Sequence, residues 1–195
     1  MHELALLSVA IFAIVSAGCA PTPEVTAEGG SAARTLLAEQ AAKGPVLAIV
    51  RGTALGLAPA ERDALVTRAM AQGVAGLGVR FTSDREDAVV RDPYLVVALD
   101  PASAAPATLA CRRPDAVATA AAERALRVLA AFCQDGEIVG TARGETQAPV
   151  ADRRQFERLL WRVAGGLFPD DYAETYGFGI LPRGIDLGVG GSTGF

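Results

Sequence analysis

The chain has 195 residues, of which 51% are hydrophobic and 6% aromatic, and it carries a formal net charge of −4 at pH 7. This length allows one hydrophobic core of ordinary size together with a leader and tails, and it is too short for two sizeable cores. The acidic balance is the opposite of the basic footprint of a nucleic-acid binder, so we expect no nucleic acid among the partners.

The first predicted element is an export signal. An apolar run over residues 4–15 is well short of the roughly 20 residues that a bilayer-spanning helix needs, and it has the length of a signal-peptide core. Three small residues, Ser16 to Gly18, lead directly into Cys19. This order resembles the bacterial lipoprotein signal, which implies that residues 1–18 are removed and that Cys19 becomes a lipidated, palmitate-bearing N-terminus. Each buried acyl methylene contributes about 0.8 kcal/mol, so two or three chains would hold the protein on a membrane.

The leader departs from that resemblance in one respect, because it has no lysine or arginine, only His2 and the α-amino group. Signal sequences normally begin with positive charge. Two alternatives therefore stay open: an uncleaved membrane anchor, and an ordinary secretory signal that happens to hold a cysteine. In the lipoprotein family a residue other than aspartate after the cysteine is usually compatible with transfer to the outer membrane, and Ala20 fits that rule. The resemblance thus implies the periplasmic face of the envelope, at the outer membrane.

The chain after this cysteine divides into three predicted segments. Residues 19–31 contain prolines, glycines and small polar residues without an apolar period, which predicts a flexible, disordered tether. Residues 32–171 are predicted to form a single α/β domain, held some tens of ångströms from the bilayer by that tether. Residues 172–195 are too rich in glycine to hold a packed element without outside support, so we predict a mostly unstructured tail.

Apolar spacing predicts alternating helices and strands in the first half of the domain. Good helix formers over residues 32–43 end just before a Gly-Pro pair, which predicts a short helix. An apolar run at 46–50 predicts a buried strand, and a proline-initiated segment at 59–74 has apolar residues at helical spacing. A short strand follows at 79–81, and after a charged loop the strongest strand is expected at 94–99.

The second half begins with an alanine- and proline-rich stretch, residues 101–122, which we interpret as a loop with a helical turn starting at Asp115. Residues 125–145 have two possible structures, since some apolar residues also fit a helical face. We favour a hairpin, because Asp135-Gly136 is a strong turn dipeptide. A last helix is predicted from a capping-box variant at Asp152 to Phe168, with its apolar residues on one face.

This order of elements predicts an α+β fold. Two main helices with apolar faces and about 4–5 strands favour a two-layer sandwich, with a small mixed sheet and both helices on one of its faces.

Catalytic and metal-binding patterns are weak in this chain. The only histidine, His2, lies in the leader, so the processed protein would lack Ser-His and Cys-His catalysis and histidine metal ligation. Ser192 lies in a G-x-S-x-G pattern, but that motif needs a helix after it and a histidine partner. Asp84, Glu86 and Asp87 lack the longer spacing of a calcium loop and favour a solvated loop. We expect no enzyme activity, no metal and no cofactor.

The two cysteines that remain after lipidation, Cys111 and Cys133, form an even pair in an oxidising compartment. A disulfide between them is the natural pairing, and closing a loop of this size contributes about 3 kcal/mol in the chain-entropy model. The alternative is two buried free thiols. A redox role is disfavoured, because nothing places a base or a close second cysteine beside either residue.

The last predicted helix carries a candidate partner surface. Arg154, Arg158 and Arg162 fall on one stripe of this helix, and Trp161 falls away from its main apolar face. The stripe could meet anionic lipid or an acidic partner, and the tryptophan either covers the helix edge or is offered to a partner. The alternative interpretation is an ordinary solvated helix face.

Three segments carry a family resemblance: DPYLVVALDP, RVLAAFCQDGEIVGTARGE and FERLLWRVAGGLFP. Over residues 45–169 they resemble a group of envelope lipoproteins from Gram-negative, mostly alphaproteobacterial, cells. In that group one cysteine follows the central strand and another ends the first hairpin arm, which fits Cys111 and Cys133. The fold pattern is also similar to small α/β lipoproteins that assist cell-wall synthases or secretion machines.

These observations favour a non-enzymatic, lipid-anchored periplasmic domain that binds another envelope component through its sheet edge or its last helix. The alternative is a carrier that holds a small molecule or a lipid between the helices and the sheet. A deep apolar pocket would favour the carrier, and a filled core with exposed apolar surface near Trp161 would favour the binding domain. A third possibility, a histidine-free hydrolase using carboxylates, has no spaced acidic pair to support it.

Overall fold

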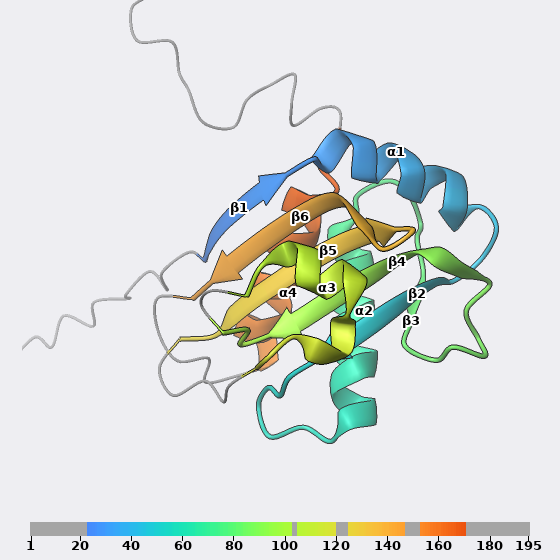
Figure 1. The fold of residues 1–195 in the computed structure, drawn as a ribbon. Helices are drawn as coiled ribbons and strands as arrows, with labels where there is room; N and C mark the ends of the chain where they lie inside the picture. The colour runs from blue at the N-terminus through green and yellow to red at the C-terminus, as the bar shows by residue number, and fades with distance from the viewer. Residues whose placement is uncertain (1–22, 103–104, 120–124, 147–152, 171–195) are drawn as a thin grey trace, which may run out of the picture.

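The computed structural model describes residues 23–102, 105–119, 125–146 and 153–170, which form an α+β fold around one mixed sheet (Figure 1). The sheet has six strands in the order β1-β6-β5-β4-β2-β3. Strand β2 runs parallel to β3 and β4, and the other neighbours are antiparallel. The strands are β1 (Glu24–Glu28), β2 (Val46–Arg51), β3 (Phe81–Thr82), β4 (Val90–Leu99), β5 (Arg127–Gln134) and β6 (Glu137–Glu145).

Helices cover both faces of this sheet. The helices are α1 (Gly30–Ala41), α2 (Pro59–Gly73), α3 (Ala107–Arg112) and α4 (Arg153–Leu167), with a 3₁₀ turn η1 at Pro114–Ala116. The first, second and fourth pack on one face and share its hydrophobic core, whereas α3 and η1 lie over the other face (Figure 1). The mixed α+β fold with α2 and α4 on one face is confirmed, but a single helix layer is an incomplete description.

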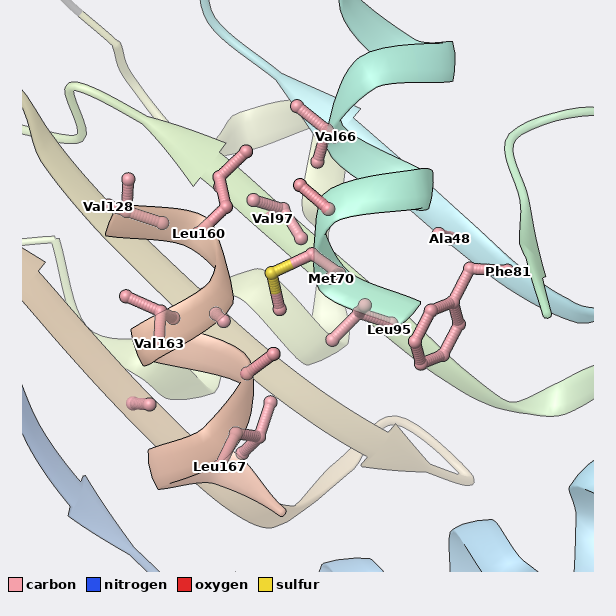
Figure 2. Packing of buried hydrophobic residues seen from close by; sticks show 14 of the residues in the cluster. Ala48, Val66, Met70, Phe81, Leu95, Val97, Val128, Leu160, Val163 and Leu167 are labelled. Atoms are coloured by element: carbon pink, nitrogen blue, oxygen red, sulfur yellow. The ribbon is translucent and has the colours of Figure 1, made fainter. Parts of the chain in front are cut away.

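The main core lies between the sheet and its three-helix face. Figure 2 shows Val66 and Met70 of α2 and Leu160, Val163 and Leu167 of α4 converging over Leu95 and Val97 of β4. All seven of these side chains are buried. Apolar residues of α4 recur at spacings of three and four, so the helix buries one continuous stripe.

Three aromatic rings close one end of this core. Phe168 lies just after α4. The centroid of its ring is 5.2 Å from that of Phe132 of β5, in an edge-on arrangement, and 6.4 Å from that of Phe81 of β3. Such pairs contribute beyond their buried area, by about 0.5–1.5 kcal/mol each. They connect the end of the last helix to both a central strand and the short edge strand.

The hairpin prediction is confirmed. Strands β5 and β6 pair antiparallel through a two-residue turn, in which Asp135 has φ 52° and Gly136 has φ 76°. Positive φ at both positions is the backbone of a turn whose twist matches the flanking strands. Leu129 and its neighbours on β5 are buried without a break and belong alternately to the two hydrophobic clusters, as expected for a central strand covered on both faces and not for a helix.

The tether prediction is wrong for its second half, because residues 24–28 form strand β1, which pairs with β6, and α1 begins at Gly30. This strand raises the count to six, above the predicted 4–5. Its side chains are mostly exposed, so the composition resembles that of a tether although the backbone is paired. Gly29 forms the turn between strand and helix, with φ 73°, and a Cβ at this position would lie 2.5 Å from the carbonyl oxygen of Val139.

Two further boundaries differ from the predictions. Strand β4 starts at Val90 and not at residue 94, since Val89 and Val90 donate to the carbonyl of Pro45 at the start of β2. The alanine-rich segment contains helix α3, which the sequence did not indicate, besides the predicted turn beginning one residue before Asp115. Long-range pairing and packing, not local propensity, decide both cases.

The tight contact between the end of α2 and α4 predicts that a larger residue at Gly73 lowers the stability of the domain. A Cβ on Gly73, the last residue of α2, would lie 2.6 Å from Cβ of Ala164 and closer still to the carbonyl oxygen of Trp161. Gly73→Ala should therefore lower the free energy of unfolding by about 1–3 kcal/mol through overpacking. Gly165→Ala on α4 is the matched control, because its nearest neighbour would be 3.6 Å away and alanine favours the helix by about 0.5–1 kcal/mol. Urea unfolding midpoints measure both, and equal midpoints for the two variants would contradict this packing.

Candidate functional site

The outer side of α4 carries the candidate surface that the sequence indicated. The inner stripe of this helix is fully buried on the sheet, which forces residues at the intervening positions outward. Arg154 and Arg158 are exposed, one turn apart, and Trp161 is 52% exposed another turn along. We call these three residues the α4 face.

Trp161 covers the edge of α4 and also remains exposed, so it combines the two alternatives that the sequence left open. Its indole Nε1 donates to the carbonyl oxygen of Gln72 at 3.1 Å, so the ring is fixed across the seam between α4 and α2. Half of the side chain nevertheless remains in contact with solvent. A rigid, half-exposed indole offers apolar area to a partner at a low cost in side-chain entropy.

Arg162 does not belong to this face. The prediction grouped it with the exposed stripe, but the residue is half-buried, and its guanidinium donates to the carbonyl oxygen of Pro23 at 3.2 Å. Pro23 directly precedes β1, so Arg162 helps to hold the edge strand against α4. The stripe is therefore correct for Arg154 and Arg158 and wrong for Arg162.

The charges beside the α4 face neutralise one another. A guanidinium nitrogen of Arg153 lies 3.0 Å from a carboxylate oxygen of Glu157, and another lies 4.0 Å from one of Glu61. The guanidinium of Arg68 on α2 lies 3.7 Å from the same carboxylate of Glu157. By contrast, Arg154 and Arg158 make no ion pair or hydrogen bond with any residue in the described ranges. Among the described residues, the α4 face thus presents two positive charges without an ion-pair partner, a pattern that complements an acidic surface.

The predicted disulfide is present in the structure. Cys111 of α3 and Cys133 of β5 are bonded, their Cα atoms lie 5.5 Å apart, and both residues are buried. The bridge fastens α3 to the sheet face opposite α4, where both cysteines join a second, smaller hydrophobic cluster. Tyr94 of β4 adds to this attachment, since its hydroxyl donates to the carbonyl of Cys111.

Two side chains of β4 near the disulfide, those of Asp92 and Tyr94, have a shifted pKa. Burial, with a smaller contribution from the charge of Asp92, raises the pKa of Tyr94. Burial is the largest cause of the raised pKa of Asp92 itself, whose carboxylate accepts the backbone N–H of Asp135 at 3.1 Å. Asp92 and Tyr94 share the first half of β4 near the disulfide and have structural partners.

Other predicted positions add no chemistry to the described residues. Cys19 and Ser192 lie outside them. The side chain of Asp84 accepts the backbone N–H of Glu86 at 2.7 Å, as in a local turn, and no group of three or more potential metal ligands occurs in the described ranges. In the same ranges, no helix is long and apolar enough to cross a membrane.

One feature of the surface was not predicted from the sequence. A hollow of about 400 Å³ follows the outer side of β2, between the start of α2 on one face of the sheet and η1 on the other. Its existence depends on β3 being only two residues long, and the sequence had no signal for how far that strand would pair. We call this hollow the β2 groove.

The described residues thus define a small α+β domain with a basic, tryptophan-bearing helix face and a groove at one sheet edge. No protein-family model matches this chain, and no curated protein matches it. Among solved structures it is similar to a PelC dodecamer from Paraburkholderia phytofirmans, with 14% identity, a TM-score of 0.43, and coverage of 75% of this chain and 97% of that one. A PelC variant from the same organism gives 16% identity, a TM-score of 0.41 and the same coverage. A likeness this distant identifies neither a family nor a function.

Loss of the disulfide should destabilise the domain. Replacing both cysteines by alanine, Cys111→Ala with Cys133→Ala, should lower the free energy of unfolding by about 3 kcal/mol, because the bond closes a loop of 22 residues. Urea unfolding measures this loss, and the α4 face should stay as it is in the folded variant because it lies on the other side of the sheet. Alkylation of two thiols in denatured, unreduced wild-type protein would contradict the pairing.

Proposed function

We propose that this chain is a lipid-anchored periplasmic domain without enzyme activity, which binds another component of the cell envelope. Lipid on Cys19 holds it at the outer membrane, and the α4 face binds an acidic surface on the partner. The two parts of the proposal rest on different features, so each has its own test.

The α4 face is the observation that carries the binding role. A helix that buries its whole apolar stripe has no structural need for an exposed tryptophan, yet Trp161 is fixed in place and half-exposed. Arg154 and Arg158, two turns and one turn before it, are also exposed and add two positive charges that have no ion-pair partner in the described ranges. Aromatic side chains and arginine together are the residues that carry most binding energy in protein interfaces.

Two observations support the anchor: the sequence of the leader and the disulfide between Cys111 and Cys133. The apolar run, the small residues and Cys19 have the order of a lipoprotein signal. A buried disulfide is typical of an exported domain, since cytosolic proteins keep their thiols reduced.

The core favours a binding domain over a small-molecule or lipid carrier. Apolar side chains of α1, α2, α4 and the sheet form one contiguous buried cluster in the space where a carrier would hold its ligand (Figure 2). The β2 groove is lined by charged residues as well as apolar ones and lies at the sheet edge. Neither feature resembles the enclosed apolar cavity of a carrier.

The anchor predicts a clear change on replacing one cysteine. Wild-type protein should fractionate with membranes, incorporate radiolabelled palmitate and begin at residue 19. Cys19→Ser should incorporate no label, because serine cannot form the thioether. The Cys111→Ala, Cys133→Ala variant is the control and should still be labelled. An intact mass that shows an unmodified Cys19 in wild-type protein would overturn the anchor without touching the binding role.

The binding role predicts a charge-dependent contact at α4. A photo-crosslinking residue at position 158 should give a protein adduct in intact envelopes, and Arg154→Glu should reduce its yield at least tenfold by reversing the charge one turn away. Arg113→Glu is the matched control, because that exposed arginine lies beside α3 on the other face. Equal yields from the two variants, or adducts with bulk lipid alone, would contradict a protein partner at this face.

A further inference from the structure

Strand β2 is left partly unpaired on its outer side. Its first two residues, Val46 and Leu47, pair with Phe81 and Thr82, and there β3 ends. The remaining residues, Ala48–Arg51, pair with β4 on the inner side, but no strand in the described ranges pairs with them on the outer side. Four residues of strand, about 13 Å, are therefore open to a further strand.

The direction of the free backbone groups follows from one hydrogen bond. The N–H of Val46 donates to the carbonyl of Arg80 at 2.9 Å, so the backbone of Val46 faces the outer side. Backbone groups alternate along a strand, which places those of Ala48 and Val50 on the same outer side. Their N–H and C=O groups form the hydrogen-bonding ladder that an added strand needs.

The β2 groove gives this open edge two walls. Asp63 of α2 stands on one side, and Pro114 and Asp115 of η1 stand on the other, around a volume of about 400 Å³. Both walls are tied to the end of β2: Arg51 forms an ion pair with Asp115, and Arg62, beside Asp63, donates to the carbonyl of Gly52. The walls leave a slot that an extended chain can enter.

We propose that the β2 groove binds an extended segment of a partner protein, which adds to the sheet as a strand beside β2. This inference rests on the proposed function only in assigning the domain a binding role, and it uses a surface separate from the α4 face. Backbone hydrogen bonds to Ala48 and Val50 would provide the affinity, as in other cases of strand addition. A carboxylate on the segment would meet Arg85, an exposed arginine at the β3 end of the groove, which has no ion-pair partner in the described ranges.

The walls also decide which occupant fits. The walls disfavour pairing of β2 with β2 of a second copy, because each copy would bring its own α2 and η1 residues to the same edge. A single extended segment brings no such walls. The opposite sheet edge differs, since β1 is exposed and carries Glu24 and Glu28, charges of the kind that protect an edge against pairing.

Hydrogen exchange tests the free edge directly. In the purified full chain in detergent, the amides of Ala48 and Val50 should exchange at least tenfold faster than those of Ile49 and Arg51, which face β4. If Ala48 and Val50 are already protected in the free protein, then another part of the same chain or a second copy occupies the edge, and the proposal is wrong.

A peptide probe tests the occupant. Random octapeptides displayed on phage should yield binders without central prolines and with an acidic residue near one end. The synthetic form of the most enriched peptide should slow exchange at Ala48 and Val50 at least tenfold. Its counterpart with alternate backbone nitrogens methylated should not bind, because it cannot donate to the edge. Failure to select a peptide, or protection elsewhere than β2, would overturn the proposal.

Charge variants separate this inference from the proposed function. Arg85→Glu should weaken binding of the same peptide at least fivefold, and Arg154→Glu on the α4 face should leave it unchanged. Arg158→Glu, also on the α4 face, is the second control for a general effect of charge. Equal weakening by all three variants would show non-specific attraction and contradict strand addition. Absence of the envelope crosslink from position 158 in the otherwise unchanged protein, with peptide binding retained, would count against the α4 face alone.

Discussion

The packing of α4 onto the sheet is the interaction on which the other features of this domain depend. Six residues of the helix are buried against the strands and α2, and each fully buried large apolar side chain contributes about 1.5–3 kcal/mol. This burial sets the rotation of the helix, and the rotation sets which residues face solvent. Arg154, Arg158 and Trp161 are exposed because Phe156, Leu160 and their neighbours are not.

The same helix also organises its surroundings at short range. Gly73 lets the end of α2 approach the α4 backbone, and this contact brings the carbonyl of Gln72 within reach of the Trp161 indole. On its other flank, Arg162 binds the carbonyl that precedes β1. The polar side of α4 therefore has two roles: Arg162 holds the chain before β1, and the α4 face remains exposed to solvent.

The sequence predicted the elements whose signals are local. Helical spacing identified α2 and α4, and Asp135-Gly136 identified the hairpin, because a two-residue turn needs those backbone angles. It missed β1, since that strand depends on pairing with β6 and buries little of its own. For the candidate site, spacing alone placed Arg154 and Arg158 correctly. It could not place Arg162 or the β2 groove, because both depend on segments that are distant in the chain.

Strand β1 changes the geometry of the proposed anchor. If Cys19 is the processed N-terminus, as proposed, only the four peptide units between Cys19 and Pro23 would precede the described domain, and four units span at most about 14 Å. A lipid on Cys19 would therefore hold β1 close to the bilayer, not some tens of ångströms from it. Strands β1 and β2 are separated by four strand spacings in the sheet order, or about 19 Å. Under the proposed anchor, the β2 groove would thus lie at the sheet edge farther from the lipid, where an extended segment of a partner would have access to it.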